Sequence, residues 1–216
     1  MREAVELTGV VLEARPVGEF DRRLVILTGE RGRITAFAHG ARRPKSPLIA
    51  ASSPFVFATF SLYEGRDAYT LAEADVKEYF SGLTGRMPGV LYAFYCLELA
   101  SWFTREGVEA AGIVNLLFVT LRAIEKEQMP VKLIRRVYEL RMLTENGEYA
   151  PPEEQGNLSR SAWYALRFAS EAGYGRLYSF ALSEPAAEEF SAAVRKAMRR
   201  VVDKPFKTLA VIDEMK

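Results

Sequence analysis

The spacing of the apolar residues changes near residue 80, and this change constrains the fold more than any other feature of the chain. Before it, short runs rich in Val, Ile, Leu and Phe are separated by turn residues, which is typical of β-strands. After it, apolar residues recur at helical spacing, as in Leu91, Tyr95, Leu99 and Trp102. The sequence therefore predicts an α+β chain in which the strands come first.

The β part is compact. Strands are expected over residues 5–17, 22–28, 33–38, 54–63 and from 68 towards 80, with turns at 30–32 and 64–67. Five short strands in so few residues fit a small closed barrel, and the five-stranded oligonucleotide-binding (OB) barrel is the simplest of these. We expect an OB-fold nucleic-acid-binding domain over residues 1–80 and an α-helical domain over 81–216.

The helical part has clear beginnings and ends. Helices are predicted over residues 89–105, 108–127, 131–145, 159–172 and 183–202, and residues 206–215 form a final short segment. Ser183 is placed as an N-cap with Pro185 in the first turn, and Asn146-Gly147 is placed as a C-terminal stop.

The composition argues against several classes of protein. The net charge of +1 argues against a chain that is basic throughout. The single cysteine, Cys96, excludes an internal disulfide and lies in an apolar helical run, where a buried core residue is expected. No run approaches a membrane span and the first residues do not resemble a signal peptide, so a cytoplasmic protein is expected.

Positive charge is concentrated between residues 15 and 45, where eight Lys or Arg residues face three acids. The densest part is Ala38–Pro47, in which Gly40, Pro44 and Pro47 prevent a long helix or a central strand. A basic, irregular segment that leaves a sheet suits a phosphate backbone, although a solvated barrel surface is the alternative. The predicted DNA-binding residues are Arg15, Arg22, Arg23, Arg31, Arg33, His39, Arg42, Arg43 and Lys45.

Stacking residues are expected beside such a groove. Phe20 lies in a polar run and is predicted to be exposed, whereas Phe37 can point to either side of its strand. Catalytic residues are not predicted: His39 has no companion nucleophile, Ser46 has no evident base, and no Walker A motif is present. The expected protein is not an enzyme.

Two further basic stretches lie among the predicted helices. Lys132, Arg135 and Arg136 border apolar residues and form a possible site for an acidic partner tail, or simply the polar face of an amphipathic helix. The cations from Arg195 to Lys207 offer a second nucleic-acid contact, or only a favourable interaction with a helix dipole.

Several motifs resemble those of the RecO family of DNA repair and recombination mediators. The most specific is Ala38-His39-Gly40-Ala41-Arg42-Arg43-Pro44-Lys45-Ser46. Others are Gly18-Glu19-Phe20-Asp21-Arg22, Pro54-Phe55, Leu62-Tyr63-Glu64-Gly65-Arg66, Tyr95-Cys96-Leu97-Glu98-Leu99, Gly147-Glu148-Tyr149-Ala150-Pro151 and Phe206-Lys207-Thr208-Leu209. The resemblance spans most of the chain and is strongest before residue 80.

The resemblance implies an OB fold followed by helices. It also implies binding of single- and double-stranded DNA, annealing of complementary strands, and assistance to RecA loading on DNA coated by single-strand binding protein (SSB). RecR and the SSB C-terminal tail are the implied partners, and association with the nucleoid follows. Many relatives carry a four-cysteine zinc site where this chain has the cysteine-free residues 151–157, so no metal or cofactor is predicted. The alternative function is a protein-interaction adapter with incidental nucleic-acid contact.

Overall fold

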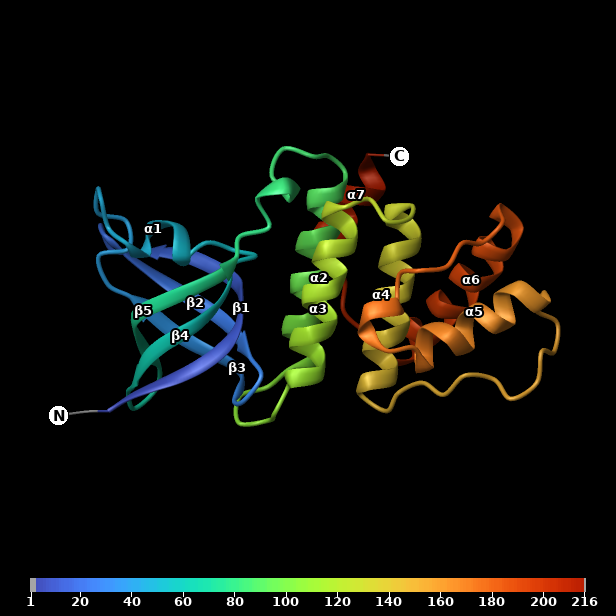
Figure 1. The fold of residues 1–216 in the computed structure, drawn as a ribbon, viewed down its shortest axis with the longest axis horizontal. Helices are drawn as coiled ribbons and strands as arrows, with labels where there is room; N and C mark the ends of the chain where they lie inside the picture. Colours follow the sequence, from blue (N-terminus) through green and yellow to red (C-terminus); the bar gives the residue numbers. More distant parts are fainter. Residues whose placement is uncertain (1–2, 216) are drawn as a thin grey trace. The chain divides into compact units, whose positions relative to one another are not determined.

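The computed structural model describes residues 3–215, drawn as a ribbon in Figure 1. The chain forms two compact units. The first runs to Ser81 and also includes Leu97–Val114; the second consists of Gly82–Cys96 and the residues from Asn115 onwards. Strands occupy the first unit and most of the helical residues belong to the second.

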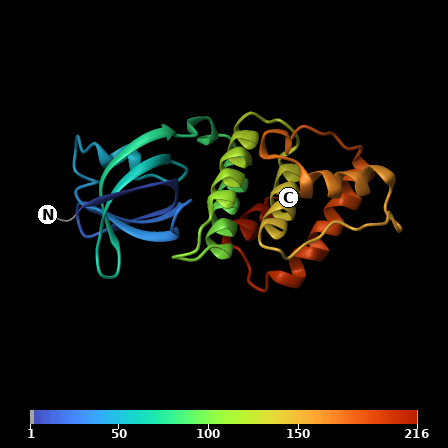
Figure 2. The same cartoon turned by 60° about the horizontal axis from the view of Figure 1, so that its bottom comes forward.

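The first unit is built on a closed barrel with the strand order β1-β2-β3-β5-β4. Its neighbouring strands are antiparallel, except that β3 and β5 are parallel. Figure 2 shows the strands curling around one another. The elements are β1 (Ala4–Val17), β2 (Asp21–Thr28), β3 (Gly32–Ala38), the short helix α1 (Leu48–Ala51), β4 (Phe57–Glu64) and β5 (Tyr69–Glu78).

The long strand β1 closes the barrel because it pairs with β4 along its first half and with β2 along its second half. The changeover is at Gly9, where an added Cβ would lie only 2.0 Å from the Leu27 carbonyl oxygen. A side chain there would clash with backbone, so glycine is required. Alternation is clearest in β3, where every second residue is buried, which explains why the sequence pattern identifies this strand.

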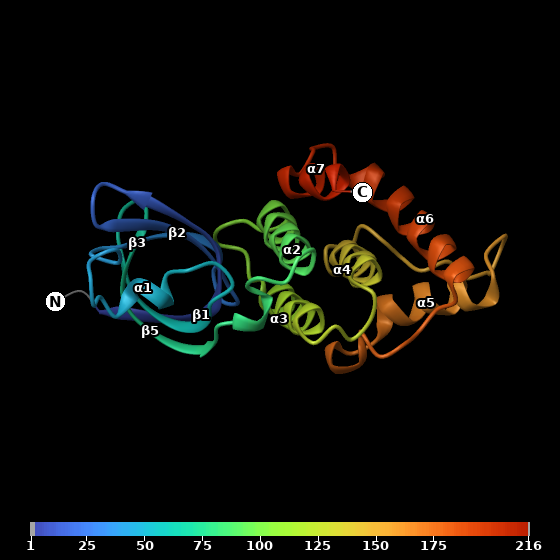
Figure 3. The ribbon, with the colours of Figure 1, turned by 90° about the horizontal axis from the view of Figure 1, so that it is seen from above.

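The helical elements follow in the order α2 (Gly89–Phe103), α3 (Ala111–Glu125), α4 (Val131–Glu145), α5 (Arg160–Glu171), α6 (Glu184–Val201) and α7 (Lys207–Glu214). Two short 3-10 turns accompany them, η1 (Ser81–Leu83) and η2 (Tyr174–Arg176). In the second unit α4 contacts both α5 and α6, as seen from above in Figure 3. Its buried side chains, including Ile134, Val137 and Leu140, therefore form the centre of the helical core.

The predicted α+β fold is confirmed: an OB-fold barrel precedes a helical region. Some predicted boundaries are wrong. The fourth strand begins at Phe57 rather than residue 54, since Phe55 has a φ of 72°. The second long helix begins at Ala111 rather than 108, since Ala110 donates its backbone N–H to the Gly29 carbonyl at 2.9 Å. Helix α1 was not predicted at all.

The helix-end signals are confirmed. Ser183 is the N-cap of α6, and Asn146 is the C-cap of α4, followed by Gly147 at a φ of 72°. Cys96 is fully buried, as expected. Within residues 3–215, no helix combines the length and the apolarity that crossing a membrane requires.

Candidate nucleic-acid interface

The basic loop after β3 is bonded to the turn between β1 and β2. The backbone N–H of Arg42 donates to the Phe20 carbonyl at 2.8 Å, and the backbone N–H of Gly40 donates to Asp21 Oδ1 at 2.8 Å. Gly40 has a φ of 66°, a conformation that glycine adopts without strain. Turn and loop thus form one continuous surface at one end of the barrel, which we call the hairpin–loop surface: residues 18–21 and 38–47.

Asp21 is the anchor of this surface. Its carboxylate accepts the Gly40 N–H and also lies 2.8 Å from Nδ1 of His39. The backbone bond from Gly40 and then the bond from His39 lower the pKa of Asp21 below its usual value. Sequence reasoning counted Asp21 only as an acid that reduces the local charge; its position beside a turn, before a basic strand, was the available signal.

Two aromatic rings border the loop. Phe20 is 37% exposed, as the sequence predicted, and the guanidinium of Arg43 lies 5.2 Å from its ring centroid. Phe37 stacks with His39 at 6.4 Å between ring centroids and 15° between planes. Phe37 is half-buried. An exposed ring next to cations, as Phe20 is, can stack on unpaired bases while the cations neutralise phosphates.

Three loop cations are exposed: Arg42, Arg43 and Lys45. The Arg42 guanidinium has one long bond to the Gly18 carbonyl, at 3.3 Å, and Arg43 lies over Phe20. None of the three forms an ion pair among the described residues. These side chains are therefore available to an anionic ligand.

Arg15 and Arg23 extend the hairpin–loop surface along the strands. They are direct partners in the β1–β2 register, and Arg23 is the partner of Phe37 in the β2–β3 register. Directly opposed residues point to the same face of a sheet, so the three side chains share the outer face of the barrel. Arg15 is paired with Glu13, and Arg23 Nη2 lies 3.4 Å from Thr35 Oγ1.

The other three predicted arginines are engaged in internal bonds. Arg22 Nη1 donates to the carbonyls of Ile49 and Ser52, each at 3.0 Å, and thereby holds α1 against β2. The same nitrogen also lies within hydrogen-bond distance of the Ser52 and Ser53 hydroxyls, so this guanidinium is occupied by bonds within the fold.

Arg31 and Arg33 are bonded in the same way. Arg31 Nη1 lies 2.8 Å from the Tyr69 hydroxyl and 3.0 Å from Glu64 Oε2, and these bonds raise the pKa of Arg31. Arg33 Nη1 donates to the carbonyl and the hydroxyl of Ser101, at 2.5 and 3.0 Å. Of the nine predicted residues, four lie on the hairpin–loop surface and two, Arg15 and Arg23, extend it along the strands. The remaining three, Arg22, Arg31 and Arg33, act as internal cross-links.

Of the predicted tail-binding cations on α4, two are engaged in internal ion pairs and one is not. Arg135 Nε and Arg136 Nη1 bind the two oxygens of Glu139 at 2.8 and 2.6 Å, and the Tyr95 hydroxyl donates to Glu139 Oε1 at 2.7 Å. Glu139 is 1% exposed. Burial acts to lower the pKa of Arg135, but the Glu139 carboxylate outweighs it and the pKa is raised. Lys132 is exposed and remains available.

Glu139 was missed by sequence reasoning. The signal was present, because it follows Arg135 by four residues and Arg136 by three, which are the spacings of helical ion pairs. Its neighbours Tyr138 and Leu140 are both fully buried, which indicates a carboxylate facing the core.

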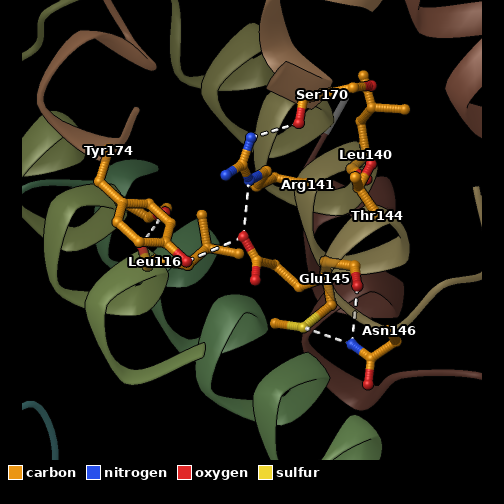
Figure 4. Close-up of polar contacts among 10 residues, drawn as sticks. Leu116, Leu140, Arg141, Thr144, Glu145, Asn146, Ser170 and Tyr174 are labelled. Atoms are coloured by element: carbon orange, nitrogen blue, oxygen red, sulfur yellow. Dashed lines mark hydrogen bonds and ion pairs between the residues drawn. The ribbon is translucent and has the colours of Figure 1, made fainter. Parts of the chain in front are cut away.

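A second polar network fixes the end of α4 (Figure 4). Arg141 Nε binds Glu145 Oε1 at 2.9 Å and its Nη1 donates to the Ser170 carbonyl, while the Tyr174 hydroxyl donates to Glu145 at 2.9 Å. Burial, and then the bond to Glu145, raises the pKa of Tyr174 to about 12. These bonds connect α4 with the end of α5 and with η2.

The nearby residues 151–157 do not fit a zinc site. They contain no cysteine or histidine, and thiolates and imidazoles are the ligands that structural zinc prefers. In the part of the chain that the structure describes, no three His, Cys, Asp or Glu residues are grouped as metal ligands. We assign no role to zinc in this chain.

A closed five-stranded barrel followed by helices, with an exposed basic loop at one barrel end, defines the class: an OB-fold protein with a helical C-terminal region. The family model for Recombination protein O N terminal matches residues 1–80, and the model for Recombination protein O C terminal matches residues 88–152. The chain belongs to the RecO family of DNA repair proteins.

Comparison with individual proteins supports the same family assignment. DNA repair protein RecO of Alkaliphilus metalliredigens is 37% identical over 172 residues, which cover 78% of this chain and 69% of the relative. DNA repair protein RecO of Acetivibrio thermocellus is 26% identical, with 96% of each chain covered, and that of Clostridium perfringens is 23% identical, with 98% of each covered. Membership of this family places the chain among DNA repair and recombination mediators.

Proposed function

We propose that this chain mediates DNA repair by binding single- and double-stranded DNA at the hairpin–loop surface and by annealing complementary strands there. The observation that carries the proposal is the group of exposed cations Arg42, Arg43 and Lys45 beside the exposed ring of Phe20, in a loop fixed by backbone bonds. Neutralised phosphates let two strands approach, and base pairing then supplies the sequence match.

The contacts expected at this surface set the strength of the salt dependence. Arg15, Arg23 and the three loop cations supply about five phosphate contacts. Binding of a single strand should then have a log–log salt slope of roughly −3 to −4. Stacking on Phe20 and Phe37 adds a term that favours unpaired bases.

We further propose that RecR and the SSB C-terminal tail are the protein partners, that RecA loading is assisted indirectly, and that the protein associates with the nucleoid. Of the three α4 cations first considered for the tail, Lys132 is the one left free of an internal acid. The proposed role is not enzymatic: it requires binding and alignment of strands, without cleavage of a bond.

The test is a strand-annealing assay on naked and SSB-coated DNA with Arg42→Ala/Arg43→Ala/Lys45→Ala beside the unmodified protein. The expected result is a strong loss of annealing on both substrates with unchanged thermal stability. Normal annealing by the variant would remove the loop from the mechanism. Normal DNA affinity together with loss of RecR binding would instead support the adapter function, in which the barrel docks a partner protein.

A further inference from the structure

The helical unit carries a second concentration of positive charge. From Arg195 to Lys207 there are six Lys or Arg residues and one acid, Asp203. They extend over the second half of α6 and the segment that follows it. Five of the six are exposed: Lys196, Arg199, Arg200, Lys204 and Lys207.

The packing of α6 explains why these side chains face outward. Its buried residues Ala186, Phe190, Val194 and Met198 recur every four positions and form one stripe. Lys196, Arg199 and Arg200 lie off this stripe, and residues four apart, such as Lys196 and Arg200, are neighbours on the helix surface. Like charges at this spacing are unfavourable unless an anion lies nearby.

Internal acids do not supply that anion. In residues 3–215, Arg195 alone of the six forms an ion pair, with Glu188 at 2.5 Å. The helix dipole favours cations in the last turn, which accounts for Arg199 and Arg200. It does not account for Lys196, which precedes that turn, or for Lys204, which follows the helix.

The segment after α6 is packed against the helical core. Lys204 Nζ is 5.9 Å from the ring centroid of Phe206, which packs edge-on against Tyr95 at 5.4 Å. Arg135 of α4 lies over the same Tyr95 ring at 5.0 Å. Phe206 thus fixes the segment after α6 to the helical core, while Lys204 itself stays exposed.

We propose that this α6 basic surface, consisting of Lys196, Arg199, Arg200 and Lys204, is a second nucleic-acid binding site that contacts the phosphate backbone. The cations follow a helix as a line rather than surrounding a cavity. The two cavities of 390 and 440 Å³ described in this unit are not lined by any of these four residues. A line of charges without an apolar pocket suits a phosphodiester chain better than a peptide tail, whose apolar side chains require pockets.

A second site gives the chain a way to hold two strands at once. The hairpin–loop surface binds one strand, and the α6 basic surface binds another strand or another part of the same strand. The inference concerns a separate site, so it stands whether or not the barrel binds DNA. Only its consequence for annealing depends on the proposed function.

The test counts the binding sites on the full chain for a single-stranded oligonucleotide of about eight nucleotides, a length within the range of one OB-fold site. The unmodified protein should bind two molecules per chain. Lys196→Ala/Arg199→Ala/Arg200→Ala should bind one, and so should the barrel triple variant Arg42→Ala/Arg43→Ala/Lys45→Ala. A control with the same loss of charge, Lys126→Ala/Arg160→Ala/Arg176→Ala, should still bind two.

Each outcome either supports or overturns the proposed second site. Two bound molecules on the α6 variant, or a single site on the unmodified protein that only the barrel variant removes, would overturn the proposal. A single site on the unmodified protein that the α6 variant removes and the barrel variant keeps would support it even if the hairpin–loop surface does not bind. Binding of an acidic peptide to the α6 basic surface without any oligonucleotide there would assign the surface to a protein partner and also overturn the proposal. All the substituted side chains are exposed, so nearly equal unfolding temperatures are expected for all variants.

Discussion

Two carboxylates, one in each unit, differ in whether they form ion pairs with the arginines near them. In the barrel, Asp21 accepts bonds from the Gly40 backbone and from His39, and the loop cations stay exposed. In the helical unit, Glu139 binds both Arg135 and Arg136 and is buried with them. The first carboxylate orders the loop and leaves its cations exposed, whereas the second pairs with its arginines at the edge of the core.

The comparison shows that a count of charges does not measure a binding surface. Both regions are basic in sequence, yet the side chains of Arg135 and Arg136 are only 13% and 14% exposed. What separates them is the nearest acid and its burial. Substitutions at Glu139 should therefore change stability, and substitutions in the loop should change binding.

The largest effect is expected at Glu139. Glu139→Ala leaves two partly buried guanidinium groups and the Tyr95 hydroxyl without their acceptor, so the free energy of unfolding should fall by about 3–5 kcal/mol. Urea denaturation measures this loss. Glu145→Ala, which removes a more exposed acid from the same helix, should cost less, and an equal loss from both variants would contradict the special role of the buried carboxylate.

A smaller loss is expected at Arg22. Arg22→Ala removes the donor to the Ile49 and Ser52 carbonyls and to two serine hydroxyls, so the free energy of unfolding should fall by about 1.5–3 kcal/mol. Arg43→Ala, at an exposed site, should change it by less than about 0.5 kcal/mol. Equal stability of the two variants would show that Arg22 does not act as a cross-link. Arg22 would then again be a candidate DNA-binding residue.

The smallest effect is a dependence on pH at Asp21. Because its pKa is lowered in the folded protein, its bonds to Gly40 and His39 contribute stability above the usual carboxyl pKa, and this contribution is lost as the pH falls through the lower, folded value. An NMR titration should place the Asp21 pKa below 3.8, with the Gly40 amide signal moving at the same pH. A pKa at or above 3.8, or a Gly40 amide that does not respond, would separate the loop from this carboxylate.

The barrel and the order of the helices were predictable because they depend on local spacing. Alternation in β3 and the helical spacing of apolar residues in α5 and α6 are visible without any tertiary contact. Helix α1 was not predictable, since it has four residues and lies between two proline-containing segments. The basic loop itself was identified by its charge and its turn residues.

The engagement of individual cations was not predictable, because their partners are distant in sequence. Arg22 bonds to Ile49, Arg31 to Glu64, and Arg33 to Ser101. Only closure of the barrel and the return of the chain at residues 101–110 create these contacts. Glu139 is the exception, since its spacing from two arginines was a local signal.

The most direct measurement is the salt dependence of single-strand binding by the loop variant. Arg42→Ala/Arg43→Ala/Lys45→Ala removes three proposed phosphate contacts, so the magnitude of the log–log slope should fall by about 2. The control Arg66→Ala/Lys77→Ala/Arg105→Ala removes three exposed cations elsewhere in the same unit and should leave the slope nearly unchanged. Equal slopes for the loop variant and the unmodified protein would contradict the claim that the hairpin–loop surface holds DNA.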